Sequence, residues 1–118
     1  MQLREEMPAK ATTRDTDEQI YEMQVRICKA FANTTRLRML DLLAKGEHSV
    51  SDIQNQLELS APNISQHLAI LKAAGVVSTR RDGKQILCSL TIPEVKQACG
   101  LIREVLRAQV RNGRKLVV

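Results

Sequence analysis

The stretch LSAPNISQHLAILKAAG (59–75), followed directly by VVSTRRDGKQILCSL (76–90), decides the fold of this chain. In the first part Ile64, Leu68 and Leu71 recur at helical spacing and share one face of a helix. The second part reads as two short strands around a turn. The pattern predicts an amphipathic helix that leads at once into a β-hairpin.

Specific residues mark the ends of this helix and the turn of the hairpin. Ser60 can cap the first free backbone amides, Pro62 falls in the first turn, and Gly75 suits the left-handed helix end. Asp82-Gly83 favours a two-residue type I′ turn. That turn gives a register in which Arg81 pairs with Lys84, Thr79 with Ile86, and Val77 with Cys88.

Helical periodicity predicts three helices before this segment. The first spans about 17–31, and its stripe is Ile20, Gln24, Ile27, Cys28 and Phe31. The second begins at Asn33 or Thr34, stops at Gly46, and carries inward Leu37, Met39, Leu40 and Leu43. The third begins at a capping box, Ser49-Val50-Ser51-Asp52, and runs to about Leu57.

One more helix follows the hairpin. It opens at Pro93, and its apolar stripe is Val95, Ala98, Cys99, Ile102, Val105 and Leu106. The predicted fold is mainly α with a small β-hairpin, in the order α-α-α-α-β-β-α. We expect a flexible arm over 1–16, one folded domain over 17–108 and a fraying basic tail over 109–118.

Composition narrows the classes of function. The formal charge of +5 suits a polyanionic partner. Tyr21 and Phe31 are the only aromatic residues, so binding to single strands by base stacking is poorly supported. No apolar run approaches the roughly 20 residues of a membrane span, and no signal-peptide pattern is present. We therefore expect a cytoplasmic protein that does not interact with membranes.

The polar face of the 60–75 helix carries groups that can read duplex DNA. Gln66 points away from the apolar face and is flanked by Asn63 and Ser65. Asn and Gln can bind the adenine edge in the major groove through two hydrogen bonds, and Ser can donate or accept. An ordinary solvated helix face is the alternative.

The hairpin tip supports the DNA interpretation because Arg80, Arg81 and Lys84 gather there. In the predicted register Arg81 and Lys84 oppose each other, which is unfavourable unless an anion such as phosphate lies between them. A basic strand edge that prevents sheet aggregation is the alternative.

The run from Ala32 to Leu90 resembles the winged helix-turn-helix core of ArsR/SmtB-type repressors, and the resemblance covers about 18–108. Its most specific pieces are TRLRMLDLL, SxxDI, SxxxxSQHLxxLxxAGVV and RRDGKQ. The resemblance implies a homodimer, paired through its first and last helices, that represses by binding a palindromic double-stranded operator. It assigns the operator contacts to Asn63, Ser65, Gln66 and His67, with Arg80, Arg81 and Lys84 on the wing. His67 lies nearer the buried face, which suits a phosphate contact or a packing role.

The metal sites of the resembled family are not matched. Its cysteine box on the third helix would fall at 49–52, where two serines replace the cysteines, and hydroxyls bind thiophilic ions poorly. Its zinc-type site on the last helix would fall near Ile92, Glu94, Val105 and Ala108, which lack the ligand pattern. His48 and His67 are the only histidines. The sequence therefore argues against a zinc or nickel sensor.

Three cysteines remain as candidate sensors: Cys28, Cys88 and Cys99. Their odd number and the lack of a CxxC spacing exclude a secreted disulfide framework. Cysteine commonly serves as a small buried hydrophobe, which is one interpretation. The sharper hypothesis is that the thiols converge and bind As(III) or Sb(III), as in the family's arsenic sensors.

Disulfide or persulfide chemistry is the alternative sensing mechanism. The resemblance to the family's persulfide sensors is poor: their second-helix cysteine would fall near Asp41, and their last-helix cysteine lies beyond Cys99.

Two other classes of function fit the sequence less well. An enzyme is not supported, because the chain has no Gly-rich phosphate loop, HExxH or GxSxG motif. A winged-helix module that binds proteins instead of DNA is the second rival, since one fold can serve several functions.

Overall fold

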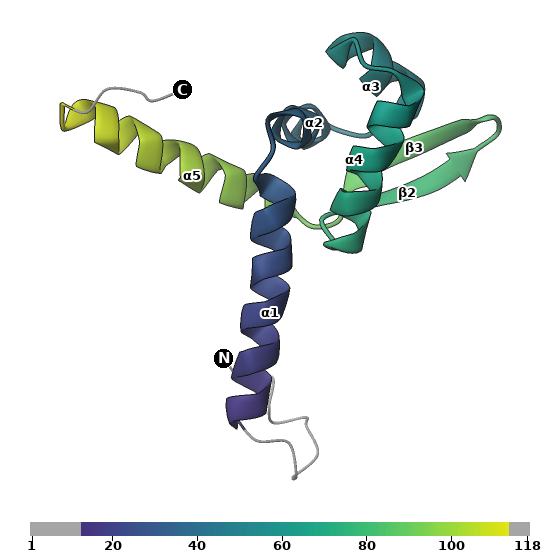
Figure 1. Cartoon of the computed structure of the whole chain (residues 1–118). Coiled ribbons are helices and arrows are strands. Elements are labelled where there is room, and N and C mark those ends of the chain that lie inside the picture. Colours follow the sequence, from purple (N-terminus) through teal and green to yellow (C-terminus); the bar gives the residue numbers. More distant parts are fainter. Residues whose placement is uncertain (1–12, 114–118) are drawn as a thin grey trace.

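A computed structural model describes residues 13–113 of the chain. Its elements in order are α1 (Thr13–Phe31), α2 (Thr34–Ala44), β1 (His48–Ser49), α3 (Val50–Leu57), α4 (Ala61–Ala73), β2 (Val77–Asp82), β3 (Gln85–Leu90) and α5 (Pro93–Arg111) (Figure 1). The predicted order of helices and hairpin is confirmed, with β1 as an addition. Residues 1–12 of the expected arm and 114–118 of the expected tail lie outside the described residues.

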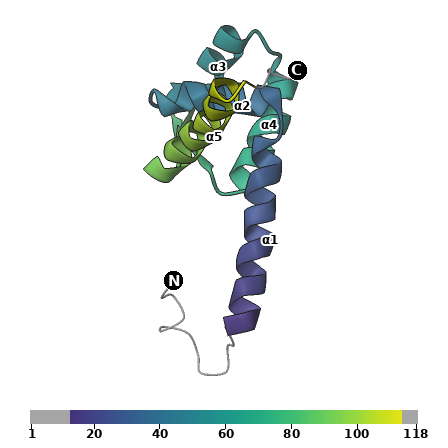
Figure 2. The ribbon, with the colours of Figure 1, turned by 90° about the vertical axis from the view of Figure 1, so that its left-hand side faces the viewer.

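The molecule has a body and two projecting helices. The body consists of α2, α3, α4 and the sheet, whereas α1 and α5 extend from it in different directions (Figures 1 and 2). Both long helices exceed their expected lengths: α1 begins at Thr13 instead of about residue 17, and α5 continues to Arg111 instead of fraying after Arg107.

An aliphatic core holds the body together. The predicted inner face of α4, formed by Ile64, Leu68 and Leu71, is buried against α2 and α3. The other buried hydrophobic residues are Ala30, Met39, Leu40, Leu42, Leu43, Ile53, Val76, Val77, Cys88 and Val95. At roughly 1.5–3 kcal/mol for each fully buried aliphatic side chain, this burial is the main force that orients α4.

Three predicted helix caps are confirmed. The Asn33 side chain accepts a hydrogen bond from the Arg36 amide at 3.0 Å. Ser49 Oγ accepts from the Asp52 amide at 3.0 Å, and Ser60 Oγ accepts from the Asn63 amide at 3.3 Å. Each satisfies an amide that the helix itself leaves without a partner.

The predicted hairpin register is wrong by two residues. Asp82 pairs with Gln85, Arg81 with Ile86, Thr79 with Cys88 and Val77 with Leu90. The two loop residues are therefore Gly83 and Lys84 instead of Asp82 and Gly83. Gly83 has φ of +66°, and Lys84 does not have a positive φ, as in a type II′ turn, which requires glycine only at its first central position.

This correction changes one argument and preserves another. Arg81 and Lys84 are not opposite each other, so no cation pair across the ladder calls for a phosphate. A shift of two residues keeps every side chain on its face, because the period of a strand is two. Cys88 therefore lies on the buried face of the hairpin in either register, and it is fully buried.

Two further differences have simple physical reasons. β1 pairs with β3 and completes a three-stranded sheet in the order β1-β3-β2, but two residues are too few to show strand alternation. Leu37, predicted to point inward, is exposed. The buried residues of α2 are Met39, Leu40, Leu42 and Leu43, and a period of 3.6 residues places Leu37 on the far side.

The core packing of α4 predicts a sharp contrast between adjacent residues. Replacing Leu71, which is 0% exposed, by Ala should lower the free energy of unfolding by about 2–5 kcal/mol through lost burial and a cavity. The matched control is Ile70→Ala, since Ile70 is 42% exposed. Urea unfolding at equal protein concentration measures both, and equal losses would contradict the assigned face.

Candidate nucleic-acid interface

The exposed face of α4 presents three polar side chains. Asn63, Ser65 and Gln66 are exposed and lie in the first two turns of the helix, after the Ser60 cap. Because Ile64, Leu68 and Leu71 occupy the opposite face, core packing turns these polar groups toward solvent. This is the part of a recognition helix that enters a major groove.

His67 differs from its three neighbours. It is half-buried, and its Nδ1 lies 3.2 Å from a terminal guanidinium nitrogen of Arg36 on α2. This nitrogen of the ring thus faces the body of the protein instead of solvent.

A shallow hollow separates α4 from the hairpin. It has a volume of about 280 Å³ and is lined on the α4 side by Ser65, Ala69 and Lys72, and on the hairpin side by Thr79 and Ile86. α4 and the hairpin are therefore neighbours that border one recess, as a recognition helix and a wing must be to contact one duplex.

One wing cation is already paired. The Arg80 guanidinium donates two hydrogen bonds, at 2.9 and 3.0 Å, to the carboxylate of Glu47 just before β1. These bonds lower the pKa of the Glu47 carboxyl and raise the pKa of the Arg80 guanidinium. Glu47 offsets the charge of Arg80, so Arg80 offers less attraction to a phosphate than the sequence indicates.

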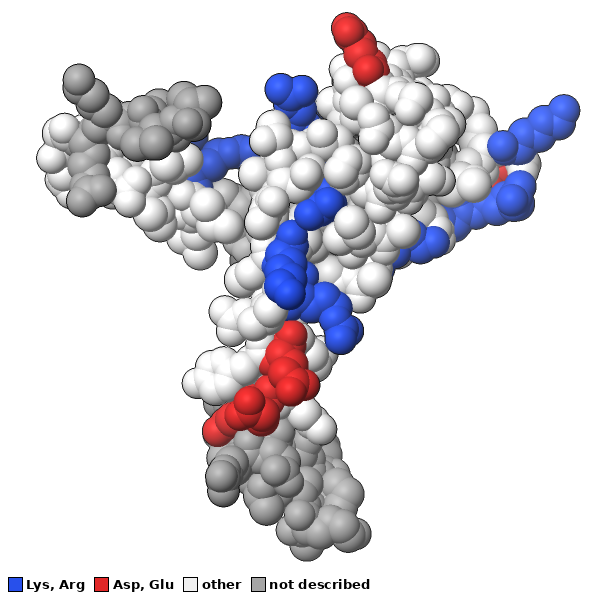
Figure 3. All heavy atoms as spheres, viewed as in Figure 1, with Lys and Arg blue, Asp and Glu red and all other residues white. Residues whose placement is uncertain are grey.

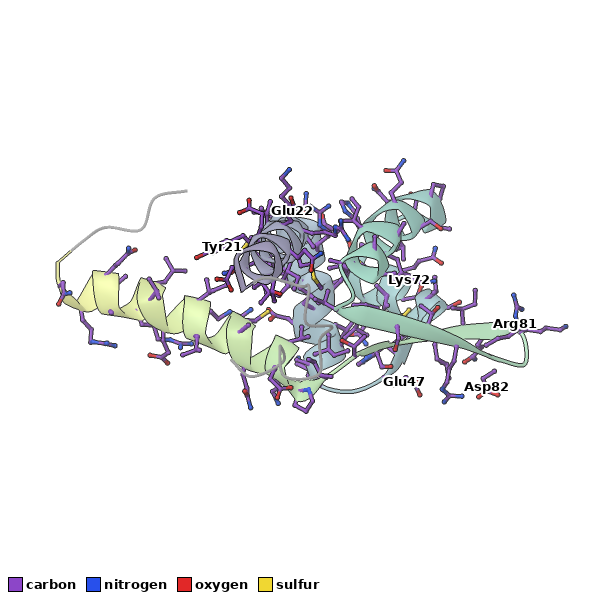
Figure 4. The ribbon with its side chains drawn as sticks, turned by 90° about the horizontal axis from the view of Figure 1, so that it is seen from below. Tyr21, Glu22, Glu47, Lys72, Arg81 and Asp82 are labelled. Atoms are coloured by element: carbon purple, nitrogen blue, oxygen red, sulfur yellow. The ribbon has the colours of Figure 1, made fainter. Side chains whose placement is uncertain are left out.

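The other two wing cations lie at the tip. Within the described part of the chain, neither Arg81 nor Lys84 forms an ion pair. Arg81 lies at the far end of the hairpin, whereas Glu47 lies nearer the body (Figure 4). Basic side chains gather at this end and where α1 meets the body, while acidic ones lie farther out on α1 (Figure 3).

Sequence reasoning missed Glu47 and Arg36. Glu47 is 33 residues from Arg80, and only the unpredicted β1 brings the two together. Arg36 lies within the TRLRMLDLL piece, but the resemblance assigned it no role. The run of cations in RRDGKQ could not reveal which of them has a counter-charge.

The three cysteines do not gather within the chain. Cys28 is exposed on α1, Cys88 is fully buried in the sheet, and Cys99 is half-buried on α5. In residues 16–113, no group of three His, Cys, Asp or Glu side chains is placed to hold a metal ion. The expected convergence of three thiols is therefore not found within one protomer.

The environments of two thiols differ from that of a free cysteine. Burial raises the pKa of the Cys88 thiol. Burial, and then the nearby Asp41 carboxylate, raise the pKa of the Cys99 thiol. A raised pKa lowers the fraction of each thiol that is present as the more nucleophilic thiolate.

Cys99 lines a cavity of about 420 Å³ between α2 and α5. An ion pair between Asp41 of α2 and Arg103 of α5 borders the same cavity. Asp41 stands near the position where persulfide sensors carry their second-helix cysteine. Here its carboxylate forms an ion pair with Arg103 of α5.

The projecting helices expose large apolar side chains. On α1 these are Tyr21, Met23 and Val25, and on α5 they are Leu101, Ile102, Val105, Leu106 and Val110. Exposed apolar surface of this kind marks an interaction site. Over the described residues, no helix is long and apolar enough to cross a membrane.

Comparison with known proteins identifies relatives over most of the chain. Residues 33–79 match the family model described as bacterial regulatory protein, arsR family. The chain is 38% identical over 81 residues to the transcriptional activator HlyU of Vibrio cholerae, covering 69% of this chain and 75% of HlyU. It is 29% identical over 111 residues to the biofilm growth-associated repressor of Xylella fastidiosa, covering 94% of this chain and 96% of that repressor.

A solved structure extends the likeness to the fold. The homodimeric winged helix-turn-helix DNA-binding domain from Mycobacterium bovis matches with a TM-score of 0.78 at 27% identity, covering 93% of this chain and all of that one. The predicted winged helix-turn-helix fold is thereby confirmed. With its polar α4 face, its basic wing and these relatives, the chain belongs to the ArsR family of DNA-binding transcriptional regulators.

Proposed function

We propose that the protein is a homodimeric repressor that binds a palindromic duplex operator and leaves it when a thiol-reactive inducer acts. The observation that carries the proposal is the placement of Asn63, Ser65 and Gln66 on the exposed start of α4, next to a hairpin whose tip carries Arg81 and Lys84, which have no ion-pair partner among the described residues. Direct base contacts from α4 would supply specificity, and the wing would supply phosphate contacts.

The exposed faces of α1 and α5 support a homodimer. Their apolar side chains have no partner within the described chain, and a second copy would bury them. The Mycobacterium bovis relative is homodimeric. A two-fold dimer presents two α4 helices related by symmetry, so its operator would be palindromic, with half-sites about one helical turn apart.

The relatives include both directions of regulation, so the proposal of repression rests on which role needs fewer additional contacts. The Xylella relative is a repressor and HlyU is an activator, so the family contains both. The described chain contains α1, α5 and a winged body, and repression requires only that this unit occupy its operator.

For the inducer, we propose thiol chemistry that joins two protomers, with trivalent arsenic or antimony as the first candidate. Cys28 and Cys99 lie on α1 and α5, the two helices with exposed apolar faces. Thiolates are the preferred ligands of soft ions. Cys88 is a weaker candidate because it is fully buried in the sheet.

Oxidation to a disulfide or polysulfide is the second candidate. It needs only two thiols, and the absence of a three-ligand group within the described part of one chain favours it over a metalloid site built in a single protomer.

Replacing Gln66 tests base reading, and replacing Arg81 tests phosphate binding. Gln66→Ala should relax selectivity at one base position, by about 1–3 kcal/mol of lost discrimination. Arg81→Ala should weaken every duplex alike and reduce the salt slope by about one. Fluorescence anisotropy with a selected duplex and its point variants, at several salt concentrations, measures both. Sequence-blind losses from both changes, or binding independent of salt, would contradict DNA reading and favour the protein-binding module.

The Arg80–Glu47 pair predicts that removing an acid strengthens binding. Glu47→Gln should free Arg80, raise affinity for any duplex several-fold and steepen the salt dependence by about one contact. Glu94→Gln, an equal charge change at an exposed position on α5, should have a smaller effect. Weaker binding by Glu47→Gln would show that Glu47 orients Arg80 instead of neutralising it.

Mobility shifts with arsenite, polysulfide and peroxide test the inducer. One of these reagents should release the selected duplex from the native protein. Cys28→Ser or Cys99→Ser should abolish that release, whereas Cys88→Ser should not. Response to arsenite alone supports the metalloid candidate, and response to the oxidants alone supports the disulfide candidate. If no reagent releases the duplex, the cysteines are packing residues and the thiol proposal fails.

A further inference from the structure

Arg36 connects three helices through its side chain. Its Nε donates to the Ala30 carbonyl at 2.7 Å, and one terminal nitrogen donates to the Lys29 carbonyl at 3.1 Å. The other terminal nitrogen lies 3.2 Å from Nδ1 of His67. One guanidinium on α2 thus holds the end of α1 and reaches the middle of α4.

The contact with α1 is a C-terminal cap. Lys29 and Ala30 belong to the last turn of α1, where the helix itself leaves carbonyls without amide partners. The Lys29 carbonyl also accepts a hydrogen bond from the Ala32 amide at 3.1 Å. A cation there also interacts favourably with the negative end of the helix dipole. Ala30 itself is fully buried, so this end of α1 is anchored where α1 meets α2 and α4 (Figure 2).

The contact with α4 constrains His67. Arginine only donates hydrogen bonds, so Nδ1 must accept and the neutral ring carries its proton on Nε2. The planar guanidinium has fixed donor directions, and two of its three nitrogens are already bound to α1. The Arg36 side chain therefore fixes the position of the His67 ring relative to the end of α1. Because the ring belongs to α4, the same contacts restrict the rotation of α4.

We infer that Arg36 and His67 are positioning residues that set the orientation of the reading helix relative to α1. His67 directly follows Gln66, so a small rotation of α4 at His67 moves the base-reading amide. This inference rests on the proposed function, in which two protomers pair through α1. The Arg36–His67 contact then sets the separation of the two α4 helices, and hence the half-site spacing that the dimer accepts.

The geometry distinguishes this role from two simpler ones. Nδ1 faces Arg36, so the body-facing nitrogen of His67 is not available to a base or a phosphate. If His67 served only to fill space between α4 and α2, a side chain of similar volume without a hydrogen-bond acceptor would do the same.

Two substitutions separate an acceptor from mere volume. His67→Asn retains an acceptor near the position of Nδ1, since the Asn side-chain oxygen lies at the same distance along the chain. His67→Leu fills similar space without an acceptor. Arg36→Lys keeps the charge but cannot make all three contacts at once.

The experiment uses the full chain and a duplex that the native protein selects from a randomised pool. Anisotropy compares this duplex with versions in which the half-sites are moved by one or two base pairs, and with a scrambled duplex of equal composition. Thermal unfolding of each variant serves as the control for folding.

His67→Leu and Arg36→Lys should each reduce discrimination between selected and scrambled duplex by about three- to thirty-fold, and should broaden the accepted spacing. Affinity for the scrambled duplex should fall less than affinity for the selected duplex. His67→Asn should restore most of the discrimination, and the Arg36→Lys/His67→Leu double variant should lose little more than either single variant.

Two results would overturn the inference, and they are distinguishable. If the native protein selects no duplex, the proposed function fails and the inference fails with it. If it selects a duplex but His67→Leu keeps both discrimination and spacing preference, the inference alone is wrong. If His67→Leu does not fold, Arg36→Lys and His67→Asn carry the same comparison, and equal discrimination by both overturns the coupling.

Discussion

The structure depends on the burial of one face of α4. Ile64, Leu68 and Leu71 pack into an aliphatic core with α2 and α3, and this packing prevents α4 from rotating about its axis. Because a helix has 3.6 residues per turn, burying one face determines what the other face presents. The exposure of Asn63, Ser65 and Gln66 is thus a consequence of apolar packing and not a separate design. The face proposed to read DNA is therefore set by a core that contains none of the residues proposed to contact DNA.

Charged groups are distributed between structural and functional roles by tertiary contacts. Arg36 binds the end of α1 and His67, Arg80 binds Glu47, and Arg103 binds Asp41. Each of these arginines meets its partner from another element of the fold, and at Arg80 and Arg103 a carboxylate reduces the positive charge that a phosphate backbone would encounter. Arg81 and Lys84 remain unpaired at the wing tip within the described residues, and there the electrostatic attraction is concentrated.

Local signals were reliable where one residue decides the outcome. Asn33, Ser49 and Ser60 cap helices as predicted, because a cap needs only a side-chain oxygen and a nearby amide. The hairpin turn was placed one residue too early, since Asp-Gly and Gly-Lys both offer a two-residue loop and the competing registers differ by two positions. β1 has too few residues to carry a pattern, so the ion pair that it brings about was not predictable either.

The sequence by itself determined the family, the order of elements and the polar face of the reading helix, because these depend on periodicity, caps and motifs that are local in the chain. Only the tertiary structure decided which cations are free, which face His67 turns inward and where the thiols lie. Those properties depend on groups 31 to 62 residues apart, such as Arg36 with His67 and Asp41 with Arg103. Ion pairs and hydrogen bonds act over a few ångströms, so no pattern within a segment can reveal them before the chain has folded.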